Sequence, residues 1–514
     1  MPSYKPKDVL KKGIKAFAKT FEEEYRSPLA SQRRTLRQLM RQAGHTAFGQ
    51  HYRFSKFIER KDLIEAFQSE VPFHDYDKIF REWWHRLLEG EPDVCWKGKV
   101  QYFGLSSGTT GASSKYIPVT SEMTKSMRLA GLRMFACLPK YKLPANLYLK
   151  KWLMIGGSAS LENRGEYFVG DLSGINSRNP PLWIRPYFKP GRDIVFLKDW
   201  DQRMKRIAEH AKEWDISIVT GIPSWVQLAF EYVIDYHGVD TIHDIWPNLT
   251  VFVTGGTAFE PYRKSLRKIT KKELIYQDSY LASEGFIAYQ SRPETHAMKL
   301  VLSNGIFYEF IPFNDDNFDD DGNILPGAKA ITVAEVEEGV DYALLITTCA
   351  GAWRYLIGDT IKFKDKERLE LVITGRTKHF LSVCGEHLSV DNMNQGIKKM
   401  EDELDVAIGE FVVHAIKSGN HFAHRWYLGS DEQLDARQIA TTLDKHLKEL
   451  NDDYRTERSA MLGDPEVVVI PCSWFVDWQR EFGKMNGQSK IPRVIKKEKL
   501  NQWNTFINAK MSGS

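Results

Sequence analysis

One stretch of the chain combines small residues, hydroxyls and a lysine at a spacing that suits phosphate binding. Eight of its eleven residues are Gly, Ser or Thr, and it runs Leu105-Ser106-Ser107-Gly108-Thr109-Thr110-Gly111-Ala112-Ser113-Ser114-Lys115. Small residues let backbone N–H groups approach a ligand, hydroxyls add hydrogen-bond donors, and the lysine adds a positive charge. The stretch therefore predicts a polyphosphate-binding loop, and with it the use of ATP.

Three other interpretations of this stretch have to be weighed. A solvated loop would have a similar composition. A Walker A loop is excluded, because Lys115 follows Ser114 rather than glycine. A serine hydrolase would use Ser106, since Gly104-Leu105-Ser106-Ser107-Gly108 matches the Gly-x-Ser-x-Gly nucleophile elbow. An elbow needs a helix directly after the serine, whereas residues 108–114 are poor helix formers and residues 116–120 predict extended chain. The loop taken alone leaves the solvated loop and the hydrolase open.

The elements that position such a loop follow from the pattern of apolar residues. Residues 8–90 predict a mainly helical scaffold. Beyond residue 100, buried strands that end in glycine alternate with helices, at 151–157, 216–224 and 249–256. This alternation predicts an α/β fold whose ligands bind at the strand ends.

The pattern of residues in the second half of the chain changes twice. Residues 331–374 predict a small β-subdomain with strands at 331–333, 344–348, 360–363 and 369–373. A separate α+β domain should follow, with helices over 393–404 and 436–450 and strands over 411–416 and 466–470. We place the domain boundary near residue 375, which gives a large N-terminal domain over 1–374 and a smaller C-terminal domain over 375–514.

Composition excludes several classes of protein. The net charge is +4, from 71 basic and 67 acidic residues, which is too balanced to indicate a nucleic-acid partner. Five cysteines form no Cys-x-x-Cys pair, so neither a zinc site nor a disulfide framework is indicated, and free thiols favour a reducing compartment. No apolar run approaches the ~20 residues needed to span a bilayer, and the N-terminus lacks a signal-peptide core. We therefore expect a cytoplasmic protein without a membrane partner.

Five further motifs accompany the loop, in a fixed order along the chain. They are Gly255-Gly256-Thr257, Tyr280-Leu281-Ala282-Ser283-Glu284, Arg354-Tyr355-Leu356-Ile357-Gly358-Asp359, Gly375-Arg376-Thr377-Lys378 and Gly487-Gln488-Ser489-Lys490-Ile491-Pro492-Arg493. Each motif alone is weak, but the ordered set resembles the adenylate-forming superfamily over nearly the whole chain. Within it, the sequence is most similar to the auxin-responsive Gretchen Hagen-type acyl acid amido synthetases, and specifically to their bacterial members.

The resemblance implies a large ATP- and acyl-binding domain, a mobile C-terminal lid, and a role for each motif. The β- and γ-phosphates would be held by Ser106, Ser107, Gly108, Thr109, Thr110 and Lys115. Gly255, Gly256 and Thr257 would lie on the adenine side, where Tyr280 would pack against the base. Ser283 would contact the α-phosphate, Glu284 would bind Mg²⁺ and take part in catalysis, and Asp359 would hold the ribose hydroxyls. Arg376 lies at the expected hinge, and Lys490 would be the catalytic lysine of adenylation.

The resemblance also implies the reaction. A small carboxylic acid would be activated as an acyl-adenylate and transferred to an amino acid amine, with ATP and Mg²⁺ as cofactors. The alternatives are an acyl-CoA ligase, a non-catalytic ATP-binding protein and, more distantly, the serine hydrolase. Two departures stand out: His387 aligns with a lysine of many plant members, and Gly111 lies one place earlier than in them. Residues 129–138 and 221–226 are candidates for the acyl pocket, although Trp225 could equally be a core residue.

Overall fold

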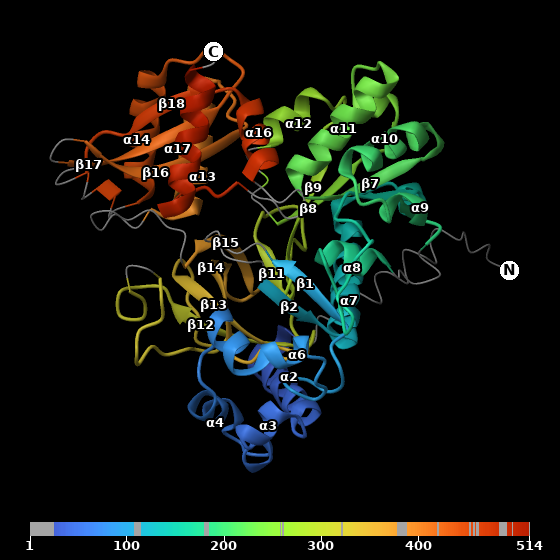
Figure 1. Cartoon of the computed structure of the whole chain (residues 1–514), viewed down its shortest axis with the longest axis vertical. Helices are drawn as coiled ribbons and strands as arrows, with labels where there is room; N and C mark the ends of the chain where they lie inside the picture. The colour runs from blue at the N-terminus through green and yellow to red at the C-terminus, as the bar shows by residue number, and fades with distance from the viewer. Residues whose placement is uncertain are drawn as a thin grey trace.

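The computed structural model describes residues 25–106, 115–178, 185–256, 259, 262–319, 322–377, 388–418, 421–451, 454–455, 458, 462–482, 491–495 and 497–512. Figure 1 shows these residues as a helical N-terminal end, a central body built around β-sheets, and a C-terminal part that packs beside α12. The mainly helical scaffold predicted for the N-terminal region is confirmed over the residues described there. Its α-helices are α2 (Pro28–Ala43), α3 (Ala47–His51), α4 (Leu63–Glu70), α5 (Tyr76–Ile79) and α6 (His85–Leu88).

A single large sheet crosses the body of the molecule. In the described part of the chain it has eleven strands in the order β12-β13-β14-β15-β11-β10-β9-β8-β7-β3-β6. One half is parallel and consists of β3 (Lys151–Met154), β6 (Phe188–Lys189), β7 (Ile216–Gly221), β8 (Val251–Gly255) and the start of β9 (Ile275–Ala282). Four consecutive residues are buried in each of β7 and β8, which explains their near-continuous apolar sequences.

The other half of this sheet is antiparallel. Its strands are β10 (Gly285–Tyr289), β11 (Met298–Leu300), β12 (Ile306–Pro312), β13 (Asp341–Thr348), β14 (Tyr355–Asp365) and β15 (Glu370–Arg376). The predicted strands at 344–348, 360–363 and 369–373 are confirmed, but they continue the large sheet instead of forming a sheet of their own. The predicted strand at 331–333 is wrong, because Ile331 makes only an isolated bridge to Phe310.

Helices α11 (Pro223–His237) and α12 (Arg263–Lys268) follow β7 and β8, as the sequence predicts. The same part of the chain also contains α7 (Ser121–Cys137), α8 (Leu172–Arg178), α9 (Arg192–Val195) and α10 (Trp200–His210). A second sheet, in the order β2-β1-β5-β4, contains β1 (Tyr102–Ser106), β2 (Lys115–Val119), β4 (Glu162–Asn163) and β5 (Phe168–Gly170). The predicted extended segment at 116–120 is therefore confirmed as β2.

The chain beyond Arg376 builds a third sheet with helices around it. Its strands pair in the order β16 (Glu410–Ser418), β17 (His421–Gly429) and β18 (Glu466–Ile470). The helices are α13 (Val390–Leu404), α14 (Ala436–Leu450), α16 (Cys472–Phe482) and α17 (Lys497–Ser512). The predicted helices at 393–404 and 436–450 and the strands at 411–416 and 466–470 are confirmed. The overall α/β class, with a large N-terminal and a smaller C-terminal part, is thereby observed.

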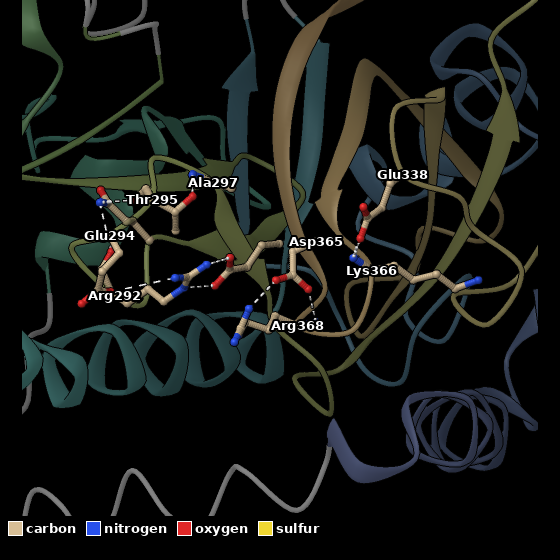
Figure 2. Close-up of polar contacts among 10 residues, drawn as sticks. Arg292, Glu294, Thr295, Ala297, Glu338, Asp365, Lys366 and Arg368 are labelled. Atoms are coloured by element: carbon tan, nitrogen blue, oxygen red, sulfur yellow. Dashed lines mark hydrogen bonds and ion pairs between the residues drawn. The ribbon is translucent and has the colours of Figure 1, made fainter.

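Ion pairs brace the turn that joins β14 to β15. Figure 2 shows Arg368 against Asp365 within the turn. Arg292 pairs with the buried Glu370 of β15. Arg292 donates two parallel hydrogen bonds to Glu370, of 2.8 Å and 2.7 Å, a geometry that fixes both partners. The backbone N–H of Lys366 also donates to Glu338 at 2.7 Å. Side-chain ion pairs and hydrogen bonds thus hold this end of the hairpin.

Two expectations from composition can be compared with the described residues. Cys95, Cys137, Cys349 and Cys472 are free thiols, and Cys384 lies outside the described part. Among the residues that could be searched, no helix has both the length and the apolar character that crossing a membrane requires.

Candidate active site

The ends of the predicted phosphate-binding loop are held side by side. Strands β1 and β2 are antiparallel, and Ser106 is the register partner of Lys115. Residues 107–114 connect them, so Ser107, Gly108, Thr109 and Thr110 lie outside the described residues, and of Ser106 only the backbone is described. A nucleophile elbow would continue into a helix packed on its own strand. Here β1 leads through eight residues to an antiparallel partner, which does not match the hydrolase interpretation.

The second predicted element, Ser283-Glu284, forms the tight turn between β9 and β10. Ala282 pairs with Gly285 across that turn. Ser283 and Glu284 are only 9% and 7% exposed, although turns normally lie in solvent. Strand β1 packs close by, since a Cβ atom built on Gly104 would lie 3.8 Å from the Cβ of Ser283. The loop base and the Ser283-Glu284 turn therefore belong to one site.

Glu284 is a buried carboxyl group whose protonation is influenced by other motif residues. Burial raises the pKa of its carboxyl from 4.5 to about 7, and the nearby charge of Asp359 adds to this rise. Lys115 and Arg376 act in the opposite direction and favour the charged form. Lys115, Asp359 and Arg376 come from motifs that are far apart in sequence. All three nevertheless lie close enough to Glu284 for their charges to affect its protonation.

Asp359 and Arg376 face each other across β14 and β15. They are register partners, and Nε of Arg376 donates to Oδ1 of Asp359 at 2.7 Å. The hydroxyl of Tyr280 donates to Oδ2 of Asp359 at 2.6 Å. The negative charge of Asp359 raises the pKa of Arg376, and burial together with Asp359 raises the pKa of Tyr280. Each carboxylate oxygen of Asp359 keeps a lone pair, so the residue can still accept ligand hydroxyls.

The glycines after β8 lie next to the strand that carries Tyr280. Gly255 is the register partner of Ser279, and a Cβ on Gly255 would lie 2.6 Å from Oγ of Ser279. Gly256 has a φ of +83°, a conformation that favours glycine. Glycine is therefore required at Gly255 for close packing and at Gly256 for backbone geometry. Thr257 lies outside the described residues.

Sequence reasoning missed Tyr76, which holds the base of the loop. Its hydroxyl accepts a hydrogen bond from the backbone N–H of Tyr116 at 2.8 Å. Nζ of Lys115 lies 5.3 Å from the centre of the Tyr76 ring, within the range of a cation–π contact. Tyr355, named only as part of a motif, is buried nearby, and the charge of Glu284 contributes to its raised pKa. No local sequence signal marks Tyr76, because its contacts form only in the folded chain.

The C-terminal part contacts the N-terminal part through α12 and the residue before it. Nζ of Lys264 donates to the backbone carbonyl of Val406 at 2.7 Å, and the hydroxyl of Tyr262 donates to Glu410 at 3.1 Å. Glu410 also pairs with Arg493, whose guanidinium packs 4.3 Å from the ring centre of Phe411. Arg493 closes the motif that contains Lys490, and Tyr262 follows the Gly255-Gly256 turn by six residues. Lys490, Lys378 and His387 themselves lie outside the described residues.

The residues present fit a magnesium ion that is held mainly by its substrate. Within the described ranges, no group of three His, Cys, Asp or Glu side chains could hold a metal. Magnesium bound with a nucleotide uses one or two carboxylates and keeps phosphate and water oxygens as its other ligands. A single buried carboxylate, as at Glu284, matches that requirement.

Two residues from the segment predicted to line an acyl pocket, Gly221 and Trp225, make packing contacts in the structure. Trp225 packs against Trp200, with ring centres 5.1 Å apart, at the edge of the core beneath α10 and α11. A Cβ on Gly221 would lie 2.7 Å from the backbone oxygen of Ile155, so Gly221 allows close strand packing. Trp225 is thus in a packing position, and these contacts do not assign it a ligand.

The GH3 family N-terminal, central and C-terminal domain models match residues 17–206, 299–369 and 391–499, which together make up more than half of the chain. A jasmonoyl-L-amino acid synthetase of Nicotiana attenuata is 32% identical over 544 residues, covering 90% of each protein.

Two solved structures share the fold. The GH3.15 acyl acid amido synthetase aligns over 95% of both chains with a TM-score of 0.77 and 17% identity. A 2-hydroxyisobutyryl-CoA ligase aligns over 94% of this chain and 92% of its own, with a TM-score of 0.56 and 13% identity. The chain therefore has the fold that these two structures share.

Proposed function

The chain belongs to the GH3 family, and from this we propose that it activates a carboxylic acid with ATP and joins it to an amino acid. The product would be an amide, released with AMP and pyrophosphate. The observation that carries the proposal is the convergence of Lys115, Glu284, Asp359 and Arg376 on one site, seen in the charges that act on Glu284. The jasmonoyl-L-amino acid synthetase relative supports an amino acid as the acceptor.

Each described residue has a task in this reaction that suits its position. Asp359 accepts the ribose hydroxyls, and Arg376 and Tyr280 hold its carboxylate in place. Lys115 supplies positive charge beside the phosphates at the base of the loop. Glu284 would hold Mg²⁺, which neutralises phosphate charge when bound. Attack of a carboxylate on a phosphate requires positioning and charge neutralisation more than a protein nucleophile.

Exchange of labelled pyrophosphate into ATP tests the first half of the reaction. We expect exchange that depends on a carboxylic acid, measured across aromatic, aliphatic and hydroxy acids with Mg²⁺ present. A folded protein that gives no exchange with any of these acids would contradict the proposal. Mass spectrometry of products formed with CoA or with mixed amino acids separates an amide from a thioester. The CoA ligase remains the second candidate, because a CoA ligase shares the fold.

Several finer points are part of the same proposal. We propose that the mobile unit begins near residue 375, that the protein works in the cytoplasm, and that it acts without nucleic acid or membrane. We also propose a bacterial origin, which the early Gly111 and His387 support as departures from plant members. In this scheme Ser106, Ser107, Gly108, Thr109 and Thr110 bind the phosphates, Thr257 lies on the adenine side, and Lys490 acts in adenylation.

The raised pKa of Glu284 predicts how activity depends on pH. A carboxyl with a pKa of about 7 is mostly protonated at pH 6 and mostly charged at pH 8. Because protons compete with the metal for this carboxylate, the KM for the magnesium–ATP complex should fall as the pH rises from 6 to 8. Exchange kinetics at saturating acid, with all ATP bound to magnesium, measure this. An equal KM at both pH values would show that Glu284 does not bind the metal.

Arg376 and Arg368 lie at opposite ends of the same hairpin and offer a matched pair of variants. Replacing Arg376 with alanine removes a charge-assisted hydrogen bond to Asp359, so the KM for ATP should rise about tenfold with a smaller change in kcat. Arg368→Ala, which removes an exposed pair with Asp365 in the braced turn, should leave the KM for ATP unchanged. Equal effects of the two variants would mean that the hairpin, rather than Asp359, is being disturbed.

A further inference from the structure

Contacts between the N-terminal and C-terminal parts are found at two places in the described part of the chain. One is the expected hinge, where a Cβ built on Gly375 would lie 3.5 Å from the backbone nitrogen of Val390, the first residue of α13. The other is α12, which Figure 1 shows beside α16 of the C-terminal part. If the C-terminal part turns about residue 375, contacts at the hinge can persist, whereas contacts far from it must separate.

Lys264 of α12 contacts the end of α13 that is far from the hinge. Its ammonium donates to the backbone carbonyls of Val406 at 2.7 Å and Glu401 at 3.3 Å. The last turn of α13 has no basic residue, so Lys264 supplies the positive charge that the C-terminus of a helix favours. The fifteen residues of α13 span about 22 Å, and a turn at the hinge would therefore pull this contact apart.

Tyr262, directly before α12, is fixed to the strands of the proposed ATP site. Its backbone N–H donates to the carbonyl of Phe259 at 2.9 Å, and the ring of Phe259 packs against that of Tyr276, with centres 3.9 Å apart. Tyr276 belongs to β9, which carries Tyr280 nearer its end. The position of Tyr262 is thus set by the strand that provides part of that site.

The side chain of Tyr262 contacts the C-terminal part close to the motif of Lys490. Its hydroxyl donates to Glu410 at 3.1 Å, and Glu410 pairs with Arg493. The three residues are 9%, 16% and 12% exposed, so water competes little with these contacts. The backbone carbonyl of Arg493 accepts from Val413 of β16 at 2.8 Å, which fixes Arg493 to the third sheet. Tyr262 therefore joins the strands of the ATP site to the residue that closes the Lys490 motif.

We propose that Tyr262 is a positioning residue for adenylation. Lys490 precedes Arg493 by three residues, which reach at most about 11 Å, so the position of Arg493 limits where Lys490 can act. Through Glu410 and Arg493, the hydroxyl of Tyr262 holds the base of this segment on the nucleotide side, and Lys264 holds the same arrangement at α13. This role rests on the proposed function. Transfer to the amine, which does not need Lys490, does not need Tyr262 either.

Tyr262→Phe removes only the hydroxyl and tests the proposal in the full chain. Pyrophosphate exchange should slow at least about tenfold, the size expected when a hydrogen bond to a charged group is lost. Amide formation from a synthetic acyl-adenylate should stay normal. Tyr236→Phe is the matched control, because Tyr236 is 50% exposed on α11, the helix that packs against α12 through Gln227 and Ser265. Normal exchange in Tyr262→Phe, or equal loss of both steps, would overturn the proposal.

A double variant with Lys490→Ala gives a readout that a merely structural tyrosine would not. If Tyr262 acts only through Lys490, Tyr262→Phe should cause no further loss of exchange once Lys490 is alanine. The same tenfold loss in that background would overturn the proposal. A wild-type protein without exchange would contradict the ligase and the positioning role together, whereas an active wild type with unaltered Tyr262→Phe kinetics contradicts the positioning role alone.

Lys264→Met tests the arrangement itself without an activity assay. The backbone N–H groups of Asp405 and Val406 donate to the carbonyl of Glu401, which Lys264 also contacts. Amide hydrogen exchange at these two residues should become about fivefold faster in the variant. Lys272→Met is the matched control, because its ammonium contacts Pro247 within the N-terminal part. An unchanged exchange rate in Lys264→Met would show that α12 does not hold α13 in solution and would overturn the proposal.

Discussion

Replacing Glu284 with glutamine is expected to slow acyl-adenylate formation at least about 100-fold, the size of effect seen when a charge-stabilising group is lost from a catalytic site. Glutamine keeps the shape of the side chain but cannot supply the anionic oxygen that magnesium prefers. The rate of pyrophosphate exchange measures the loss. Glu294→Gln is the matched control, because Glu294 is 65% exposed, lies 4.0 Å from Arg292, and follows β10 at the end away from the Ser283-Glu284 turn. A Glu284→Gln protein with normal exchange would remove Glu284 from the metal site.

The same substitution should stabilise the protein at neutral and alkaline pH. The pKa of Glu284 is about 7 in the folded state, against an ordinary value of 4.5. The folded chain therefore binds a proton more tightly than the unfolded chain between these values, and stability falls as the pH rises through this window. Glutamine avoids this loss, which is on the order of 3 kcal/mol above pH 7. Urea unfolding at pH 4 and pH 8 should show the gain only at the higher pH.

Lys490→Ala should separate the two half-reactions. If Lys490 approaches the α-phosphate and the acyl carboxylate, its loss should slow adenylation by about 100- to 1,000-fold. Transfer from a supplied, synthetic acyl-adenylate to an amino acid should remain close to normal, because that step no longer needs the lysine. Amide formation from the synthetic adenylate is measured beside pyrophosphate exchange on the same protein.

The control for this variant is Lys445→Ala, another lysine of the C-terminal part, which is 54% exposed and pairs with Glu403 on the surface. It should leave both half-reactions unchanged. Equal loss of both steps in Lys490→Ala would show that this lysine is not specific to adenylation. If the Lys490→Ala protein retained both half-reactions, another residue would have to supply the positive charge used in adenylation.

Local patterns in the sequence were sufficient for elements whose signals are self-contained. Helix α14 occupies the predicted residues 436–450, because Asp435 caps its first turn and apolar residues recur on one face. Strand β18 likewise occupies the predicted residues 466–470. The prediction of a strand at 331–333 failed because pairing stops after one residue: Ile331 bridges Phe310 of β12, whereas the backbone N–H and the hydroxyl of Thr332 both bond to the side chain of Glu335 in a turn.

The residues of the candidate site also differ in whether a local sequence pattern marks them. Glu284, Asp359 and Arg376 could be named from short motifs, because each motif holds its residue near a strand end. That Asp359 and Arg376 would face each other could not be foreseen, since an irregular register between β14 and β15 decides it. Tyr76 carries no motif at all, and its role depends on a strand that lies 40 residues away in sequence.

The pairing of Ser106 with Lys115 also determines what the loop between them can tolerate. Because the strands already hold its ends together, doubling this eight-residue connection would cost only about 0.6 kcal/mol of additional closure entropy. A slip of one residue between β1 and β2 is a different matter, since it would turn Lys115 to the opposite face of the sheet. Insertions between residues 107 and 114 should therefore be neutral for folding, whereas insertions within the strands should be severe. The length of the connection can thus vary without changing the alignment of Lys115.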